Sequence, residues 1–193
     1  MPTQECSKII RADFQLSIRR AERRDAARIE ELVEQSEALD VNSCYAYLLL
    51  CEHFSATCLV ADAIDAAGRP HDELAGFVTA YRPPSRNEAI FVWQIGVAPW
   101  ARQRQLAKEL LMALISQPAC QDVERLEATI APANVASQRL FASFAREVNA
   151  EITCVEGFSV DDFGGMPKGA LEHLPEPLYQ IGPIQVGRSR TKE

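Results

Sequence analysis

The sequence predicts an α/β (α+β) fold, with a mixed and mostly antiparallel sheet of about seven strands flanked by helices. Two observations carry this prediction. Strand and helix patterns follow one another in the order β-α-α-β-β-β-α-β-α-β-β. The run 89–98 is apolar almost throughout, as expected for a central strand that is buried on both faces. A helical pattern separates this fourth strand from the fifth, so the two should be parallel and joined by a right-handed crossover.

The first part of the chain predicts one strand and two helices. Residues 14–20 alternate in polarity, which is typical of a strand. Apolar residues then recur at helical spacing from Asp25, which is well placed as an N-cap. Either Asn42 or Ser43 can cap a second, short helix.

The middle of the chain predicts an antiparallel hairpin, because two strand patterns, 57–64 and 73–82, flank a turn at 67–70. The elements expected after the central strand are, in order, a helix over 106–116, a strand over 123–131, a helix over 134–147 begun by Asn134, a strand over 151–157 and a last strand near 178–186.

Length and composition limit the class of protein. The chain has 193 residues, 47% hydrophobic and 24% charged, which suits a soluble globular protein with one domain. We expect this domain over 14–186, after a mobile N-terminal extension (1–13) and before a C-terminal tail (187–193). No apolar run approaches the roughly 20 residues of a membrane span and the first residues do not resemble a secretory signal, so we expect a cytoplasmic protein without a membrane partner. The net charge of −7 and the lack of a basic block disfavour nucleic-acid binding.

The cysteine pattern does not suggest a metal site. The six cysteines form no C-x-x-C pair, and only three histidines accompany them, so no metal is expected. Cys44 and Cys51 lie in an apolar helical stretch, and Cys58 and Cys154 lie in apolar strand patterns. We expect reduced thiols in the core, where free cysteine packs as a small hydrophobic residue.

The stretch 93–107 is the most informative for chemistry, because a buried strand runs into a turn that opens a helix. Free N–H groups and the positive dipole end at a helix start favour phosphate binding. The strand ending V-x-P, followed by an arginine and a turn, resembles the acetyl-CoA pyrophosphate loop of GNAT enzymes, Arg/Gln-x-x-Gly-x-Gly/Ala. Three residues match it: Arg102, Leu106 and Ala107. Gln103 and Gln105 stand where glycines are common, and should strain a loop that needs positive φ. Taken alone, the loop is equally compatible with a surface turn.

A second resemblance is narrower. The segment 39–61, LDVNSCYAYLLLCEHFSATCLVA, closely matches a helix-and-strand segment specific to the diaminobutyrate acetyltransferases of ectoine biosynthesis, a family within the GNAT superfamily. Further matches follow in order, at 77–86, 92–99, 126–141 and in the pattern formed by His173, Glu176, Leu178, Tyr179 and Ile181. The resemblance covers roughly 14–185 and implies the GNAT fold, with the fourth and fifth strands parallel and splayed.

The resemblance also implies a reaction. Acetyl-CoA would donate its acetyl group to the 4-amino group of L-2,4-diaminobutyrate, giving N4-acetyl-L-2,4-diaminobutyrate and CoA by direct attack in a ternary complex. This chemistry needs a neutral amine, a polarised thioester carbonyl, a proton acceptor and a proton for the leaving thiolate. An alkyl ammonium has a pKa of about 10.4 in water, so the enzyme must deprotonate it or lower that value.

The implied substrate-binding residues are Asp40, Asn42, Tyr45, Trp93 and His173. The carboxylate of Asp40 can pair with an ammonium group, although the residue alone also fits an N-cap. Trp93 stands where many GNAT enzymes have a catalytic glutamate, and the resemblance implies that its ring borders the amine. Taken alone, the residue could also be a structural tryptophan in the core. Glu127 is the nearest candidate for a base, and its register in the fifth strand decides whether it faces the substrate. Trp93 and Glu127 are therefore the expected catalytic residues.

On the acetyl-CoA side, the backbone of Ile95 and Val97 should bind the pantetheine arm. The loop should bind the pyrophosphate through Arg102, Gln103, Arg104, Gln105, Leu106 and Ala107, and Asn134 and Ser137 should contact the co-substrate. Phe141 stands where many GNAT enzymes have a tyrosine that acts as the general acid. Water, Ser137 or another tyrosine must therefore supply the proton to the leaving thiolate.

Two other functions stay open. The chain could acetylate another small amine, such as a polyamine or an aminoglycoside, against which segment 39–61 argues. It could also be a GNAT-like binding protein with impaired acetyl-CoA binding, an option that Gln103 and Gln105 keep open. The family resemblance further suggests a homodimer, with the C-terminal strands near the interface, and a role in osmoprotection.

Overall fold

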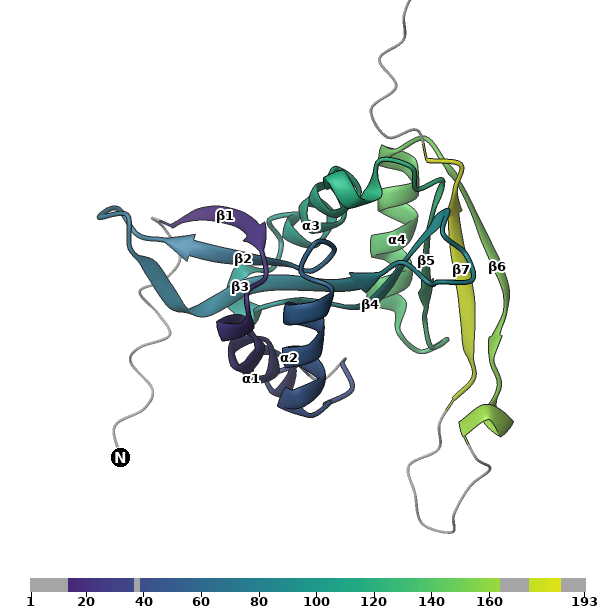
Figure 1. Ribbon diagram of the computed structural model, residues 1–193, viewed down its shortest axis with the longest axis horizontal. Coiled ribbons are helices and arrows are strands. Elements are labelled where there is room, and N and C mark those ends of the chain that lie inside the picture. Colours follow the sequence, from purple (N-terminus) through teal and green to yellow (C-terminus); the bar gives the residue numbers. More distant parts are fainter. Residues whose placement is uncertain (1–13, 37–38, 164–173, 185–193) are drawn as a thin grey trace, which may run out of the picture. The chain divides into compact units, whose positions relative to one another are not determined.

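The computed structural model describes residues 14–36, 39–163 and 174–184, and Figure 1 labels its elements. The expected extension 1–13 and tail 187–193 lie outside these residues. In chain order the strands and α-helices are β1 (Gln15–Arg20), α1 (Ala26–Glu34), α2 (Cys44–His53), β2 (Leu59–Ile64), β3 (Pro70–Tyr81), β4 (Ala89–Val97), α3 (Leu106–Ile115), β5 (Arg125–Thr129), α4 (Val135–Glu147), β6 (Glu151–Phe158) and β7 (Glu176–Gly182).

The seven strands form one sheet with the order β1-β2-β3-β4-β5-β7-β6. β4 and β5 pair in parallel, from Ala89 opposite Arg125 to Phe91 opposite Glu127, while β1–β2, β2–β3, β5–β7 and β6–β7 are antiparallel. β4 continues to Val97, past the last residue paired with β5. This topology confirms the predicted mixed sheet with parallel fourth and fifth strands.

The chain divides into two compact units. The first contains the described residues up to Thr79 together with Gln94–Leu114, and the second contains Ala80–Trp93 and the described residues from Ile115 onward. The single domain expected over 14–186 stays a prediction, and each unit is described separately below.

In the first unit, α1 and α2 lie on one face of the strands and α3 on the other (Figure 1). α1 buries Ile29, Leu32 and Val33, and α3 buries Leu106, Leu110, Leu111 and Leu114. The predicted hairpin is confirmed: β2 and β3 are antiparallel around a turn in which the N–H of Gly68 donates to the carbonyl of Asp65. Gly68 has a φ of 79°, a conformation that glycine adopts without a Cβ clash.

Asp25 lies at the start of α1, as expected, but its carboxylate does not cap that helix. Instead it accepts hydrogen bonds from the Glu22 N–H at 2.9 Å, from Arg19 at 2.6 and 2.8 Å, and from Arg28 at 2.9 Å. The side chain of Asp25 is fully buried. The N-cap interpretation was therefore wrong for the side chain, because two arginines compete for the same oxygens.

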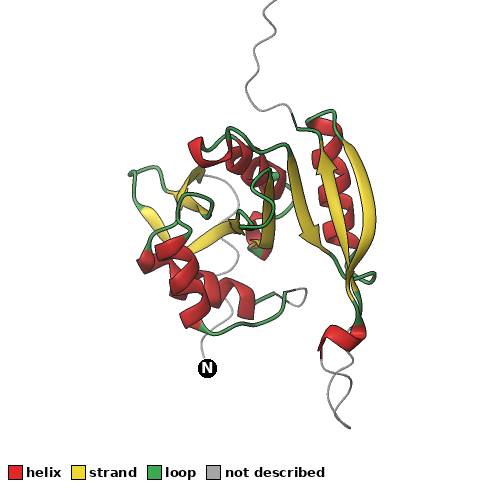
Figure 2. Ribbon diagram, turned by 45° about the vertical axis from the view of Figure 1, so that its right-hand side comes forward, coloured by secondary structure: helices red, strands yellow, loops and turns green. Residues whose placement is uncertain are grey.

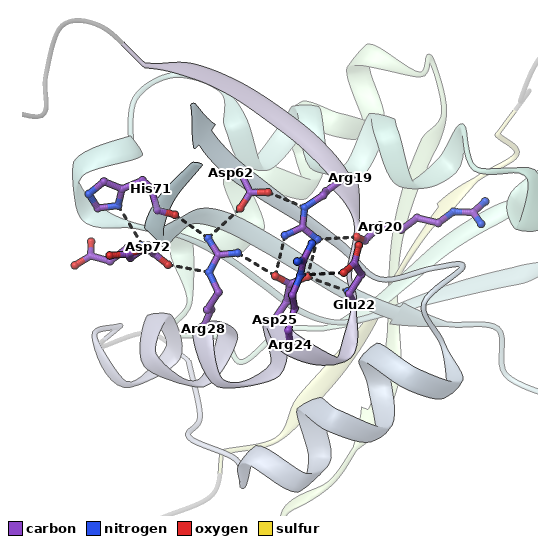
Figure 3. Close-up of polar contacts among 10 residues, drawn as sticks. Arg19, Arg20, Glu22, Arg24, Asp25, Arg28, Asp62, His71 and Asp72 are labelled. Atoms are coloured by element: carbon purple, nitrogen blue, oxygen red, sulfur yellow. Dashed lines mark hydrogen bonds and ion pairs between the residues drawn. The ribbon is translucent and has the colours of Figure 1, made fainter. Parts of the chain in front are cut away.

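A second carboxylate completes this ion cluster (Figure 3). Asp62 on β2 accepts from Arg19 Nε at 2.7 Å and from Arg28 Nη2 at 2.9 Å, so each arginine binds both aspartates. Arg28 also donates to the backbone carbonyls of His71 and Asp72. The cluster, defined as Arg19, Asp25, Arg28 and Asp62, thus joins β1, α1, β2 and the start of β3.

In the second unit, α4 packs along β6 and β7 and buries Phe141, Phe144 and Ala145 (Figure 2). The predicted cap is confirmed, since Asn134 Oδ1 accepts the Ser137 N–H at 3.0 Å. β6 lies at the edge of the sheet, and almost all of its side chains are exposed.

The cysteines divide by environment. Cys51, Cys58 and Cys120 are buried, Cys44 is half-buried, and Cys6 lies outside the described residues. Cys154 is exposed, so the expected core position was wrong for this residue, which stands on the edge strand β6. Among the described residues, no group of three or more histidine, cysteine, aspartate and glutamate side chains could hold a metal ion. In the same part of the chain, the helices lack the length and apolar character needed to cross a membrane.

Candidate active site

Three of the predicted substrate-binding residues lie close in sequence in the first unit: Asp40 and Asn42 in the connection from α1 to α2, and Tyr45 in the first turn of α2. Asp40 and Tyr45 are exposed, and Asn42 is half-buried. Asn42 Nδ2 donates to the Asp40 carbonyl at 3.1 Å, which tightens the turn before α2. Ser43, the other candidate cap, holds the N-cap position without a side-chain cap. Residues 39–45, which include the first two residues of α2, carry these three predicted substrate-binding residues, and we call them the substrate loop after that prediction.

The substrate loop is bonded to β4 through a residue that the sequence analysis did not select. Gln94 Nε2 donates to the Asp40 carbonyl at 2.9 Å, and the Tyr47 hydroxyl donates to Gln94 Oε1 at 2.8 Å. Burial raises the pKa of Tyr47 even though hydrogen bonds with Asn42 and Gln94 oppose the shift. The hydroxyl therefore stays protonated and serves as a donor. A glutamine within an apolar strand pattern was the available signal for this contact.

The two faces of β4 differ at its C-terminal end. Gln94 and Gly96 are buried, whereas Trp93, Ile95 and Val97 are half-buried. Successive side chains of a strand point to opposite faces, so the two sets occupy different faces of β4. The predicted substrate residue Trp93 and the predicted pantetheine-binding residues Ile95 and Val97 therefore share a face.

The loop before α3 adopts a left-handed backbone conformation at two glutamines. Arg102, Gln103, Arg104 and Gln105 are exposed, and α3 begins at Leu106. Gln103 has a φ of 65° and Gln105 a φ of 60°, both in the left-handed region. Each such residue costs about 1–2 kcal/mol relative to glycine. The loop thus keeps a glycine-like path at positions occupied by glutamine, and its residues fit the role of a pyrophosphate loop.

Glu127, the predicted base, lies on β5 in the second unit and is fully buried. Its Oε2 accepts from Arg86 at 3.1 Å, while its Oε1 accepts from Arg125 at 3.2 Å and from Gln180 at 2.9 Å. Arg125 also pairs with Glu88. Both oxygens of Glu127 are thus held by cationic or amide donors, an arrangement that favours a structural ion cluster over a proton acceptor.

Two of the remaining predicted residues of the second unit have a local structural role. Asn134 and Ser137 form the N-terminal cap of α4, with the hydrogen bond described above. His173 lies outside the described residues. Glu176, from the same sequence pattern, begins β7 and accepts a hydrogen bond from the Thr129 hydroxyl at 2.7 Å. Burial raises the pKa of Tyr179 on the same strand.

The fold agrees with the match of the chain to a known family. The sequence pattern of the Acetyltransferase (GNAT) family matches residues 18–145. This chain therefore belongs to the GNAT acetyltransferases.

Closer relatives define the branch of that family. The L-2,4-diaminobutyric acid acetyltransferase of Halalkalibacterium halodurans is 44% identical over 160 residues, which is 83% of this chain and 78% of the relative. That of Marinococcus halophilus is also 44% identical over 160 residues, 83% of this chain and 86% of the relative. Among solved structures, the chain is similar to diaminobutyrate acetyltransferase EctA from Paenibacillus lautus, which was solved in complex with its substrate L-2,4-diaminobutyric acid and coenzyme A. The two are 37% identical with a TM-score of 0.78, and the match covers 88% of this chain and 96% of that one. Within the GNAT family, the chain belongs to the L-2,4-diaminobutyric acid acetyltransferases.

Proposed function

We propose that this protein transfers the acetyl group of acetyl-CoA to the 4-amino group of L-2,4-diaminobutyrate, a step of ectoine biosynthesis. The products are N4-acetyl-L-2,4-diaminobutyrate and CoA. The observation that carries the proposal is 44% identity to L-2,4-diaminobutyric acid acetyltransferases over 83% of the chain. The likeness to a relative solved with diaminobutyric acid and coenzyme A supports the same substrates.

The reaction replaces a C–S bond by a C–N bond. Acetyl-CoA supplies the acetyl group as a thioester. The neutral 4-amino group forms the new bond to the carbonyl carbon, the thiolate of CoA leaves, the amine loses a proton and the thiolate gains one. The protein must therefore bind the diamine with the correct amine forward, polarise the carbonyl and provide a path for the proton.

On the substrate side, the exposed residues of the substrate loop carry the proposed contacts. Asp40 pairs its carboxylate with an ammonium group, a charge-assisted contact that is stronger than a neutral hydrogen bond. Asn42 and Tyr45 lie beside it and line the same site. Trp93 borders the reacting amine from β4, and His173 contributes from the segment before β7.

On the acetyl-CoA side, residues of β4, α3 and α4 carry the proposed contacts. The backbone of Ile95 and Val97 binds the pantetheine arm, and an N–H there polarises the thioester carbonyl. The loop before α3 binds the pyrophosphate through its backbone amides and the charges of Arg102 and Arg104. Asn134 and Ser137, at the start of α4, contact the co-substrate.

For Glu127, the structure supports a different role from the predicted base. Its two oxygens already accept hydrogen bonds from Arg86, Arg125 and Gln180, so we propose that it holds β5 to β7 and to the segment before β4. A water molecule then accepts the proton of the amine. This assignment is tested below by substitution.

The activity is tested with purified protein, acetyl-CoA and L-2,4-diaminobutyrate, by measuring released thiol and determining the product by NMR. We expect acetylation at N4 and a higher kcat/KM for diaminobutyrate than for spermidine or an aminoglycoside. Exclusive acetylation at N2, or a preference for spermidine, would refute the assignment. Calorimetric titration with acetyl-CoA distinguishes an enzyme from a protein that has lost the co-substrate.

We also propose a homodimer that uses β6. This edge strand exposes Ile152, Val155 and Phe158, and the following turn exposes Val160 and Phe163. An edge strand with exposed apolar side chains is a ready surface for a second copy. Light scattering after size exclusion tests this: we expect twice the mass of the 21.4 kDa chain, and a monomer after Val155→Lys. A cytoplasmic location and a role in osmoprotection belong to the same proposal, through the proposed ectoine product.

A further inference from the structure

Gln94 is a polar residue inside an apolar strand, and burial obliges it to find partners. Gln94 is only 8% exposed. Burying an amide without hydrogen bonds is unfavourable by several kcal/mol in an apolar medium. Both ends of this amide are bonded, the nitrogen to the Asp40 carbonyl and the oxygen to the Tyr47 hydroxyl.

Tyr47 fixes the orientation of that amide. The ring and hydroxyl of Tyr47 are fully buried on α2, and the hydroxyl donates to Gln94 Oε1. Because the oxygen of the amide is taken by a donor, its nitrogen must face the carbonyl of Asp40. The hydroxyl of Thr79 donates to the backbone carbonyl of Gln94 at 3.3 Å and leaves the side chain free for this contact.

A second contact holds the neighbouring residue of the loop. A Cβ built on Gly96 would lie 3.1 Å from Leu39 Cδ1, closer than an ordinary van der Waals contact. Glycine at this position therefore leaves space that Leu39 shares with Phe77 and Leu32, whose Cε1 and Cδ2 atoms would lie 2.7 and 3.1 Å from that Cβ. Gln94 and Gly96 are two residues apart and so share a face of β4, which fixes Leu39 and Asp40 at adjacent points on that strand.

The backbone of the substrate loop is thus held while its functional side chains stay exposed. We infer that Gln94, oriented by Tyr47, is a positioning residue that sets the place of the Asp40 carboxylate for the ammonium group of the substrate. The inference rests on the proposed function, because it gives Gln94 a role in the same substrate site. A misplacement of about 1 Å in a binding group is enough to reduce turnover strongly.

The test compares two substitutions. In each, a buried polar side chain is replaced by an apolar one of similar shape that cannot form the same hydrogen bonds. Gln94→Met cuts the bond to Asp40, whereas the matched control Thr79→Val removes a bond to Gln94 without touching the loop. We expect Gln94→Met to raise KM for diaminobutyrate about five- to thirtyfold, the effect of one to two buried hydrogen bonds, with the Kd of acetyl-CoA unchanged within about twofold. Thr79→Val should change neither constant by more than about twofold. Tyr47→Phe, which frees the amide to rotate and also removes the hydrogen bonding with Asn42, should raise KM as well.

Hydrogen exchange provides a readout that does not depend on activity. In the peptide covering 39–47, we expect amide exchange at least about tenfold faster in Gln94→Met than in Thr79→Val, since one contact that closes the loop is lost. Equal exchange in the two variants would overturn the inference, as would an unchanged KM in Gln94→Met when Asp40→Asn raises it. If the unaltered protein does not acetylate diaminobutyrate, the proposed function fails, and the exchange result alone decides whether Gln94 holds the loop.

Discussion

Among the described residues, each of the two units buries one carboxylate completely, but the surroundings of the two differ. Asp25 in the first unit is bound by Arg19 and Arg28, whose side chains are 28% and 22% exposed. Glu127 in the second unit is bound by Arg86 and Arg125, which are 42% and 35% exposed. The first pair of arginines is therefore less accessible to water than the second.

The second carboxylates differ more strongly. Asp62, which shares both arginines with Asp25, is 7% exposed, whereas Glu88, which shares only Arg125 with Glu127, is 41% exposed. Removing one partner from a buried ion pair leaves the other charge without compensation, and the penalty grows with its burial. The comparison teaches that equal burial of a carboxylate does not mean equal dependence of the fold on it.

The largest expected effect follows from Asp25→Asn. Two poorly hydrated arginines lose a charge partner, so we expect the free energy of unfolding to fall by about 3 kcal/mol. Urea denaturation measures this change, with Arg23→Gln as the control, because the Arg23–Glu52 pair is exposed and should contribute less than about 0.5 kcal/mol. Similar losses in the two variants would show that the ion cluster is not a special feature of the first unit.

Glu127→Gln should have a smaller effect, about 2 kcal/mol, because water reaches Arg86 and Arg125 more easily. The folded variant should keep kcat within about threefold and an unchanged pH–rate profile. General base catalysis is worth about 10²- to 10⁴-fold. A loss of that size together with loss of the acidic limb of the profile would restore Glu127 as the base.

The exposed loop before α3 contrasts with both ion clusters. The unfavourable contribution to folding there is backbone strain, whereas in the ion clusters it is the burial of charge. Gln103→Gly with Gln105→Gly should tighten acetyl-CoA binding by about 1–2 kcal/mol, or roughly five- to thirtyfold, because without the two Cβ atoms the loop backbone can approach the pyrophosphate more closely. Glycine also increases the entropy lost on ordering, which reduces the gain without reversing it. The measurement is the acetyl-CoA dissociation constant at one salt concentration. Equal or weaker binding by the double variant would contradict this account of the loop.

The smallest expected effect is on the pH dependence of stability. Burial alone would raise the pKa of Asp25, but hydrogen bonds from Arg19, the Glu22 N–H and Arg28, with the charge of Arg19, lower it overall. A lowered folded-state pKa gives stability that is present above the unfolded value of about 3.9 and is lost as pH falls through the folded value. Below about pH 4, the free energy of unfolding should therefore fall less steeply with decreasing pH in Asp25→Asn than in the unaltered protein. The two slopes should differ by less than about 1.4 kcal/mol per pH unit, the limit for one titrating group. Parallel curves for the two proteins would show that Asp25 does not titrate in this way.

Local signals predicted the elements of the fold, and contacts between distant residues escaped them. The turn at Gly68 and the cap at Asn134 depend on a few neighbouring residues, so the sequence shows them directly. Asp25 looked like a cap although both arginines that bind it, Arg19 and Arg28, lie within six residues of it in the sequence. What holds those arginines in place is Asp62, 43 and 34 residues away from them, and that contact exists only once β1, α1 and β2 are assembled. Cys154 has an apolar strand pattern around it, but only the strand order places β6 at an edge.

The candidate site divides in the same way. The family match selected the loop around Asp40 and the turn before α3, and the positive φ predicted for Gln103 and Gln105 is present. Gln94 escaped notice because its importance lies in a bond across 54 residues of sequence. The substrate and co-substrate contacts of the site residues stay predictions.

The alternation of β4 also determines where the chain can change its length. Gln94 and Gly96 face the substrate loop, and Ile95 and Val97 face the other way, so a residue inserted into or deleted from the strand between 90 and 93 would exchange these two sets. A change of side-chain rotamer cannot return a residue to the other face of a strand. Such an insertion or deletion would therefore remove the hydrogen bond from Gln94 to the Asp40 carbonyl and would also misplace Ile95 and Val97. The exposed 65–69 turn of the β2–β3 hairpin has no such constraint, since an added residue there lengthens a loop in solvent. We therefore expect insertions to be tolerated at the tip of the hairpin, and insertions and deletions to be excluded from β4.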